Sequence, residues 1–205
     1  HYPLRRQRQM CIRDSLVGAT GFIGHHLLAA LHAYGHRLVA TSRSGRGPEL
    51  PGVEWRVLDL ASLGSDSRAF DWPVGVELVI NAAGLLSSDM RVLDAVQDRG
   101  SRALFDLATR HGARVLQFSA LGADEHRDVP FLASKAAADT YLLDLGIPAV
   151  VLRPSLVLGR GGASSAWLTR LSPWPVIPLL DVRARAQPMH IDDLVAAVLA
   201  LLRHW

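Results

Sequence analysis

A glycine-rich turn near the beginning of the chain has the residue types and spacing of a phosphate-binding loop. The run Gly18-Ala19-Thr20-Gly21-Phe22-Ile23-Gly24 follows the apolar pair Leu16-Val17 and opens a helical pattern. Gly18 allows a tight turn, Gly21 lets the backbone approach a pyrophosphate, and Gly24 allows the helix to pack closely. The helix N-terminus adds backbone amides and a positive dipole end. The pattern predicts a dinucleotide site in a first strand–turn–helix unit.

The segment after the second expected strand indicates which dinucleotide is bound. An acidic residue there would pair with the ribose 2′-hydroxyl of NAD, whereas an arginine would accommodate the 2′-phosphate of NADP. No Asp or Glu occurs from His25 to Pro48, and the segment carries Ser42 and Arg43, with Arg46 in support. A guanidinium forms charge-assisted hydrogen bonds to phosphate, so NADP(H) is favoured and NAD(H) is the alternative. Solvated loop arginines would be the plainer explanation.

The elements that must position this turn alternate along the chain. Short β-branched apolar runs predict strands at residues 12–17, 37–41, 53–58, 77–81, 114–119 and 149–152. Helical periodicity predicts helices at residues 22–33, 89–111, 131–145 and 191–202. Three glycines fall at helix ends, where a left-handed C-cap favours glycine: Gly35, Gly112 and Gly146. We therefore expect an α/β fold, a Rossmann-like doubly wound parallel sheet with helices on both faces.

Composition divides the chain into three parts. Residues 1–15 are arginine-rich but lack the serine content and apolar stripe of a transit peptide, and we expect a non-native or artefactual leader. Residues 16–158 form the expected dinucleotide-binding Rossmann domain. Residues 159–205 begin with a stretch rich in Gly, Pro, Ser and Trp and return to a helix. This last part is expected to be the start of a truncated C-terminal substrate lobe.

Bulk composition argues against several classes of partner. The formal net charge is only +3, and no basic stripe with interleaved aromatics is present, so nucleic acid is not expected. The most apolar run, residues 194–202, is too short for a bilayer, so membrane association is not visible. A single cysteine, Cys11, leaves no internal disulfide and fits a reducing compartment, from which we expect a cytoplasmic location. No metal site is expected.

Further motifs combine with the glycine-rich turn: Asp59-Leu60, Asn81-Ala82-Ala83-Gly84, Ser134-Lys135 and Arg153-Pro154. Together they resemble the extended and atypical short-chain dehydrogenases/reductases, which include epimerases and dehydratases of nucleotide sugars. The resemblance extends from about Leu16 to the end of the chain. Residues 119–124 (SALGAD) and 187–193 (QPMHIDD) are most similar to an atypical branch. That branch contains the nucleotide-binding accessory subunit of respiratory complex I and its bacterial relatives.

The resemblance implies a role for each matching residue. Asp59 and Leu60 would flank the adenine, and Ala82, Ala83 and Gly84 would line the middle of the cofactor. Lys135 would hold the nicotinamide ribose hydroxyls, and Pro154 and Ser155 would border the nicotinamide. The complete candidate cofactor set is Gly18, Thr20, Gly21, Phe22, Ile23, Gly24, Ser42, Arg43, Asp59, Leu60, Ala82, Ala83, Gly84, Ser119, Lys135, Pro154 and Ser155. Taken singly, Asp59 would be a solvated strand-end carboxylate and Lys135 an exposed helix lysine.

The catalytic residues that the resemblance implies are largely replaced. Enzymes of that family place a tyrosine, the general acid/base, one helical turn before the lysine. This position is Phe131, which cannot carry a proton. The usual Ser or Thr is expected two residues after Ser119, where the chain has Leu121. Lys135 is therefore the remaining candidate catalytic residue.

These observations predict an NAD(P)-binding protein, with NADP(H) favoured, a degraded Ser-Tyr-Lys centre, and weak or no ordinary oxidoreductase activity. One alternative is an active NAD(P)-dependent reductase or sugar-nucleotide epimerase/dehydratase that uses Lys135. A second alternative is a cofactor-stabilised interaction module for a protein partner. The expected partners are the dinucleotide and a small-molecule substrate of unknown identity.

Overall fold

A computed structural model describes residues 13–171, 173 and 187–205 of the chain. The chain forms two compact units, residues 1–153 and residues 154–205. The division falls at Arg153–Pro154, slightly before the domain boundary that the composition predicts. Of the expected leader, residues 1–12 lie outside the described residues, whereas residues 13–15 belong to the first strand.

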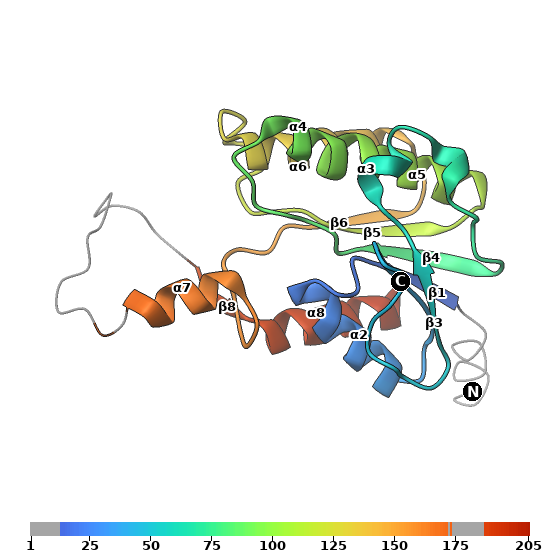
Figure 1. Ribbon diagram of the computed structural model, residues 1–205, viewed down its shortest axis with the longest axis horizontal. Helices are drawn as coiled ribbons and strands as arrows, with labels where there is room; N and C mark the ends of the chain where they lie inside the picture. The colour runs from blue at the N-terminus through green and yellow to red at the C-terminus, as the bar shows by residue number, and fades with distance from the viewer. Residues whose placement is uncertain (1–12, 172, 174–186) are drawn as a thin grey trace. The chain divides into compact units, whose positions relative to one another are not determined.

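The first unit is built on one six-stranded parallel sheet (Figure 1). Its strands are β1 (Arg13–Val17), β2 (Arg37–Ser42), β3 (Val53–Val57), β4 (Val76–Asn81), β5 (Arg114–Phe118) and β6 (Ala149–Leu152). The strands lie in the order β3-β2-β1-β4-β5-β6, and each pair of neighbours runs parallel. This order confirms the predicted doubly wound fold. The direction of winding reverses between β1 and β4, which is where such sheets bind ligands.

Helices cover both faces of this sheet. They are α2 (Phe22–Ala33), α3 (Leu60–Leu63), the 3-10 turn η1 (Ser67–Ala69), α4 (Met90–Leu93), the π-helical segment η2 (Asp94–Arg99), α5 (Gly100–Arg110) and α6 (Pro130–Asp144). Figure 1 shows α3, α4, α5 and α6 on one face and α2 on the other. The predicted glycine C-caps are confirmed, because Gly35, Gly112 and Gly146 all have positive φ angles.

The core consists of strand residues that are buried on both faces, as a parallel sheet covered by helices requires. Val39 of β2, Val79 of β4 and Val115 of β5 are fully buried and belong to one cluster with Phe105 of α5 and Leu142 of α6. On the opposite face, α2 packs on β1 and β2. Its buried stripe recurs with the predicted helical period: Leu27, Leu28 and Leu31.

The helix predicted over residues 89–111 is present from Met90 to Arg110, but its middle is π-helical rather than α-helical. Asp89 caps α4, the six residues of η2 are π-helical, and α5 begins at Gly100. Close packing explains why a glycine begins α5: a Cβ on Gly100 would lie 2.3 Å from the carbonyl oxygen of Leu60 in α3. The backbone of α5 therefore contacts the backbone of α3 at Gly100. The extra residue per turn in the π-helical segment changes which side chains before Gly100 face the core.

The second unit contains β7 (Val157–Leu158), α7 (Ala163–Leu171), β8 (Met189–His190) and α8 (Ile191–His204). β7 and β8 form a short parallel pair. α8 confirms the last predicted helix and extends it, and His190 caps it by accepting a hydrogen bond at Nδ1 from the Asp192 amide. Among the helices of the described residues, none is long and apolar enough to cross a membrane.

β1 carries a buried carboxylate between two leucine-bearing strands. Asp14 is fully buried and lies in register with Leu38 of β2 and Leu78 of β4. Its Oδ2 lies 2.6 Å from Nδ1 of His36, whereas its Oδ1 has no hydrogen-bond partner among the described residues. A buried polar atom without a partner costs about 1–3 kcal/mol.

Replacing Asp14 alone would leave His36 without its partner, so we predict that the double substitution Asp14→Val/His36→Leu increases the free energy of unfolding by about 1–3 kcal/mol. The measurement is urea denaturation followed by circular dichroism. Glu77→Val is the control, because Glu77 is an exposed residue of β4 and should change stability by less than about 0.5 kcal/mol. A loss of stability in the double variant would contradict the prediction and assign a net stabilising role to the Asp14–His36 pair.

Candidate functional site

The glycine-rich turn between β1 and α2 lies directly against the loop that follows β4. Gly18 has a φ of +75°, and a Cβ on it would lie 2.8 Å from the Cα of Ala83. A Cβ on Gly24 would lie 2.1 Å from the Gly18 carbonyl oxygen, so the helix packs on the turn itself. These two glycines are required by contacts within the protein, whatever ligand it holds.

Gly21 differs from these two glycines. It is exposed and has an ordinary φ of −73°. Among the described residues, one atom lies within 4 Å of a Cβ built on Gly21, the Gly18 carbonyl oxygen at 3.2 Å. Within the same described part of the chain, no side chain caps the N-terminus of α2. The open face of Gly21 and the helix amides beside it fit the pyrophosphate of a dinucleotide.

The loop after β2 presents Arg43 at the carboxyl end of that strand. Arg43 is exposed, whereas Ser42 is buried. The Ser42 hydroxyl accepts a hydrogen bond from the Arg46 amide at 3.0 Å and donates one to the Arg46 carbonyl at 2.8 Å. Ser42 therefore fixes the turn on which Arg43 stands.

Asp59 and Leu60 follow β3 and begin α3. The Asp59 carboxylate caps the helix, accepting from the Ala61 amide at 3.2 Å and from the Ser62 hydroxyl at 3.0 Å. It is half-buried, and a carboxylate has further lone pairs with which to accept from an adenine amine. The Leu60 side chain, in contrast, is buried in the core cluster.

A buried network of amide side chains supports the loop after β4. Asn81 Oδ1 accepts from the Ala83 amide at 3.2 Å, and Asn81 Nδ2 donates to Gln117 Oε1 at 2.8 Å. Gln97, from the π-helical segment η2, accepts at Oε1 from the Leu85 amide at 3.4 Å and donates from Nε2 to the Ser134 hydroxyl at 3.0 Å. Buried side-chain amides thus hold the first part of the loop, at Ala83 and Leu85.

The sequence analysis did not identify Gln97 and Gln117. A signal was present for Gln117, which is a glutamine within the apolar run Val115–Phe118 of a predicted strand; Gln97, followed by Asp98 and Arg99, gave no such signal. A polar residue buried at such a position needs hydrogen-bond partners and therefore indicates a loop or site that it supports.

Lys135 lies beneath the same loop and is buried. Its Nζ donates to the Ala83 carbonyl at 3.1 Å and to the Phe118 carbonyl at 2.9 Å. A Cβ on Gly84 would lie 3.4 Å from that nitrogen. An ammonium has three donors, so one remains after these two contacts. Lys135 is the only lysine of the chain, and it is not an exposed helix lysine.

Burial controls the protonation of this lysine. Desolvation lowers the pKa of Lys135 to about 8, although the carboxylate of Asp139, one helical turn further along α6, opposes the shift. Burial also raises the pKa of Asp139, while Ser119 and Arg153 lower it. The Ser119 hydroxyl lies beside this carboxyl group without a hydrogen bond of ordinary geometry.

Arg153 connects Asp139 to the loop after β5. Its Nε lies 3.2 Å from an Asp139 carboxylate oxygen, and its terminal nitrogens lie 2.6 and 3.1 Å from the two oxygens of Asp124. Arg153 therefore holds the loop after β5 against α6. This pairing helps to fix the helix turn that carries Lys135.

Neither position that the resemblance assigns to an acid–base hydroxyl carries one. Phe131 lies one turn before Lys135 on α6 and is half-buried, and its carbonyl accepts from the Ser134 hydroxyl at 2.9 Å. Leu121 is 55% exposed on the loop after β5. The structure thus brings Gly18, Ala83, Gly84 and Lys135 together, with Phe131 at the position that the resemblance gives to tyrosine.

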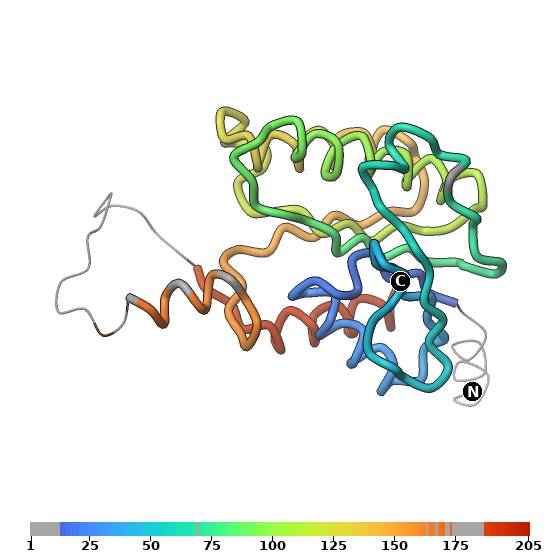
Figure 2. Tube along the Cα trace, viewed as in Figure 1, coloured from blue at the N-terminus to red at the C-terminus, as the bar shows by residue number. Residues whose placement is uncertain are grey.

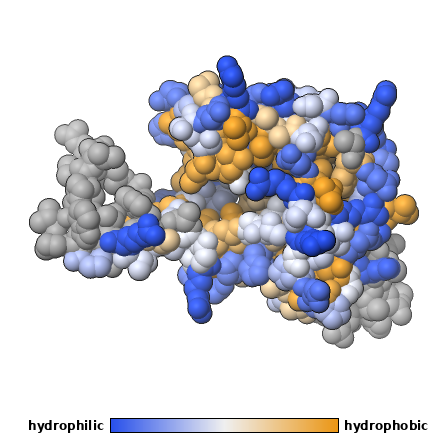
Figure 3. Space-filling view, viewed as in Figure 1, coloured by the Kyte–Doolittle hydropathy of each residue, from blue (hydrophilic) through white to orange (hydrophobic). Residues whose placement is uncertain are grey.

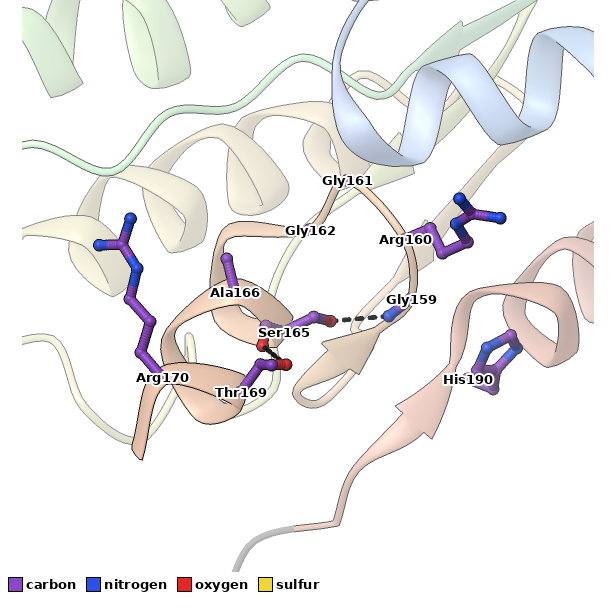
Figure 4. Close-up of a pocket in the computed structure, with 9 residues that line it drawn as sticks. All are labelled: Gly159, Arg160, Gly161, Gly162, Ser165, Ala166, Thr169, Arg170 and His190. Carbon is purple, nitrogen blue, oxygen red and sulfur yellow. Dashed lines mark hydrogen bonds between the residues drawn. The ribbon is translucent and has the colours of Figure 1, made fainter. Parts of the chain in front are cut away.

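The second unit holds the remaining candidates and a separate open cavity (Figure 4). Ser155 donates a hydrogen bond to the Gln187 carbonyl. The cavity of about 810 Å³ is lined by Gly159, Arg160, Gly161, Gly162, Ser165, Ala166, Thr169, Arg170 and His190. The Ser165 hydroxyl accepts from the Gly159 amide at 2.8 Å and fixes the glycine-rich turn before α7.

Metal-ligating side chains do not cluster in the part of the chain that the structure describes. No group of three or more His, Cys, Asp or Glu residues there could hold a metal ion.

Comparison with known families identifies the family to which this fold belongs. The NAD dependent epimerase/dehydratase family matches residues 15–205. This chain belongs to that family. The resemblance inferred from the motifs is thereby confirmed.

Three curated relatives align with 92% of this chain. A protein of Caulobacter vibrioides (strain NA1000 / CB15N) named ceramide reductase is 32% identical over 195 residues. Mitochondrial proteins of Dictyostelium discoideum and Arabidopsis thaliana, named NADH dehydrogenase (ubiquinone) 1 alpha subcomplex subunit 9, are each 25% identical, over 195 and 199 residues. The chain spans 60%, 54% and 50% of these relatives' lengths, respectively.

Solved structures confirm the fold. MoeE5 with UDP-glucuronic acid and NAD has a TM-score of 0.74 and 22% identity, covering 91% of this chain and 71% of that one. WbmG of Bordetella bronchiseptica with NAD and UDP has a TM-score of 0.73 and 20% identity, covering 91% and 67%. A UDP-galactose 4-epimerase has a TM-score of 0.70 and 22% identity, covering 94% and 72%. At these identities the likeness concerns the fold alone.

The lowered pKa of Lys135 predicts a pH-dependent stability. A lysine whose pKa falls from 10.5 in the unfolded chain to about 8 in the folded protein binds fewer protons when folded. Below pH 8 the lysine is charged in both states, and the full free-energy cost of burying its ammonium group destabilises the folded protein. This cost decreases as the pH rises toward 10.5, because the folded protein then holds the lysine in its neutral form. We expect the free energy of unfolding, relative to that of Lys135→Met, to rise between about pH 7 and about pH 9.5, by roughly 1–3 kcal/mol. Parallel profiles for the two proteins would contradict this account.

Proposed function

We propose that this chain binds a nicotinamide dinucleotide in the turn from Gly18 to Gly24, prefers NADP(H) to NAD(H), and has lost the ordinary acid–base hydroxyls of its family. The observation that carries the proposal is the open face of Gly21 beside the uncapped N-terminus of α2, described above. The turn contacts Ala83, and the Ala83 carbonyl accepts from Lys135. A dinucleotide that starts at Gly21 would therefore extend along this loop toward the lysine.

Arg43 supports the preference for NADP(H). It is exposed at the carboxyl end of β2, and the turn that carries it is fixed by Ser42. No carboxylate from His25 to Pro48 competes for the ribose 2′ position or repels a phosphate there. A guanidinium in this place would neutralise a 2′-phosphate and hydrogen-bond to it.

Each part of the cofactor would be bound by a different residue or group of residues. The α2 amides next to Gly21 would hold the pyrophosphate, and Asp59 would accept a hydrogen bond from the adenine amine. The third N–H of the Lys135 ammonium would donate a hydrogen bond to a nicotinamide ribose hydroxyl. When bound, the nicotinamide supplies hydride transfer. Phe131 and Leu121 can neither hold nor deliver the accompanying proton, so ordinary carbonyl chemistry would be slow.

A specific observation favours a second candidate, an active reductase with Lys135 as proton donor. The pKa of Lys135 is lowered to about 8 by burial, so at neutral pH the group still carries a proton and releases it more readily than an exposed lysine. The relative named ceramide reductase agrees with a reductive role. The two relatives named as subunits of a respiratory assembly favour instead a protein partner around the same cofactor-bound fold.

Gly21→Val tests the cofactor site directly. We expect it to weaken NADPH binding by at least about 100-fold while leaving the far-ultraviolet circular dichroism spectrum unchanged, because the added side chain fills pyrophosphate space. Calorimetric titration with NADPH provides the measurement. Ala29→Val, at an exposed position of the same helix, is the matched control and should bind as the parent does. Parental affinity in Gly21→Val would show that the turn has only a structural role.

Arg43→Ala tests the cofactor preference. We expect the affinity for NADPH to fall about 10- to 100-fold, the effect of losing a charged hydrogen bond, with little change for NADH. The ratio of the two dissociation constants, from fluorescence titration, is the decisive quantity. Arg37→Ala, at the exposed opposite end of the same strand, should leave the ratio unchanged. Equal parental affinities for the two cofactors would end the NADP assignment.

Phe131→Tyr combined with Leu121→Ser tests the degraded centre. Positioned acid–base groups contribute about 10²–10⁴-fold, so the double variant should gain NADPH oxidation with a panel of carbonyl compounds while its NADPH affinity stays unchanged. Phe131→Leu serves as the control and should remain at background. Brisk turnover by the parent that Lys135→Met abolishes would contradict the proposal and establish the lysine as the working acid.

A further inference from the structure

The loop that leaves β2 contacts the next strand, β3, at the edge of the sheet (Figure 2). We call residues 43–48 the arginine loop, because this segment holds two arginines. On β3, Trp55 and Val57 are two residues apart, so their side chains lie on the same face of the strand. The arginine loop has two glycines at the same spacing, Gly45 and Gly47. Each glycine of the loop meets one of these two side chains.

Trp55 holds the end of the arginine loop in two ways. A Cβ on Gly47 would overlap the indole ring, so the loop backbone lies directly against that ring. The indole Nε1 donates a hydrogen bond to the Pro48 carbonyl at 3.1 Å. Trp55 is half-buried, which leaves one side of its ring available to the loop. The ring therefore limits how far the loop can move away from β3.

The beginning of the arginine loop is fixed by the end of β2. The Ser42 carbonyl accepts a hydrogen bond from the Gly45 amide at 3.2 Å and another from the Leu58 amide, just after β3, at 2.9 Å. The Ser42 hydroxyl bonds to the backbone of the same loop, as described above. With Trp55 at the far end, the loop is attached at both ends. Its two arginines lie between the attachments.

Fixed backbone distinguishes these two arginines from other exposed charged residues. Hydrophilic side chains are scattered over the face drawn in Figure 3, so an exposed arginine is ordinary on this molecule. Arg43 and Arg46 are both exposed, and the backbone that carries them is held from both sides. Binding an anion there would order fewer backbone torsions than binding on a loose loop, and so would cost less conformational entropy.

We propose that Trp55 is a positioning residue for the choice of cofactor: by holding the arginine loop against β3, it places Arg43 to bind the 2′-phosphate of NADP(H). The inference rests on the proposed function, because it assumes that the 2′-phosphate lies at Arg43. It adds that the preference depends on the backbone that carries the arginine as well as on the guanidinium. The contact with Gly47 is the decisive one, because it brings the largest side chain of β3 against the loop.

Trp55→Ala tests the positioning role through the dissociation constants for NADPH and NADH, measured by fluorescence titration. We expect NADPH binding to weaken about 10-fold and NADH binding to change less than about 2-fold. Trp55→Phe keeps a ring against Gly47, loses the hydrogen bond to Pro48, and should retain most of the preference. Gly47→Ala adds a carbon that pushes the loop away from the ring, and should lower the preference as Trp55→Ala does.

Leu107→Ala is the control for a general loss of stability. Leu107 is buried in the core cluster on α5, so its truncation destabilises the fold without touching the arginine loop. We expect the ratio of the two dissociation constants to stay unchanged in this variant. A structural role alone would make Trp55→Ala and Leu107→Ala behave alike.

Limited proteolysis tests the contact without any cofactor. Trypsin cleaves after arginine, and the loop offers Arg43 and Arg46. We expect cleavage after these two residues to be about 10-fold faster in Trp55→Ala than in the parent, because the loop then opens more often. Cleavage after Arg127, exposed on the loop before α6, is the internal reference and should be unchanged. Mass spectrometry of the fragments identifies the sites.

Unchanged cleavage within the loop, or an unchanged ratio of dissociation constants in Trp55→Ala, would overturn the inference. So would an equal change of the ratio in Leu107→Ala. The two claims fail in different measurements. A parent without preference for NADPH contradicts the proposed function and this inference with it, whereas a parental preference that survives Trp55→Ala overturns the inference alone.

Discussion

The site depends on the contact between two backbone segments at the reversal point of the sheet. Gly18 approaches Ala83 so closely that a single added carbon would overlap it. This contact joins the turn after β1 to the loop after β4, and Lys135 holds that loop from below through the Ala83 carbonyl. The turn proposed to hold the phosphates, the loop proposed to follow the cofactor and the lysine thus form one connected structure. A side chain at Gly18 would separate all three.

The second constraint is the burial of one charged group. The Lys135 ammonium group is removed from water and donates hydrogen bonds to two carbonyl groups instead. The carboxylate of Asp139, one helical turn away, offsets part of the free-energy cost of this desolvation. Such a group is costly, and it is retained next to a phenylalanine where the family has its tyrosine. The proposed loss of the acid–base hydroxyls, with the lysine kept, fits the proposed cofactor-holding role. It also fits a reaction in which the lysine delivers the proton.

The sequence predicted the strand positions, the doubly wound fold class and the glycine-rich turn because strand and helix periods and glycine spacing are local properties. It did not predict α3, the π-helical segment or the support given by Gln97, since these arise from packing between distant segments. Gly100 illustrates the limit: inside a helical pattern it looks like a weak residue, yet it is the contact point with Leu60. Likewise, the burial of Lys135 depends on carbonyls that are 52 and 17 residues away in sequence.

The most direct test of the central claim uses the fact that Lys135 is the only lysine in the chain. Lysine labelled with ¹³C at Cε gives one side-chain resonance, which reports whether the dinucleotide reaches the amine. We expect NADP⁺ to shift this resonance in proportion to its binding, and adenosine 2′,5′-bisphosphate, which lacks the nicotinamide ribose, to bind without shifting it. Binding of NADP⁺ that leaves the resonance unchanged would contradict the account, because cofactor and lysine would then occupy separate places.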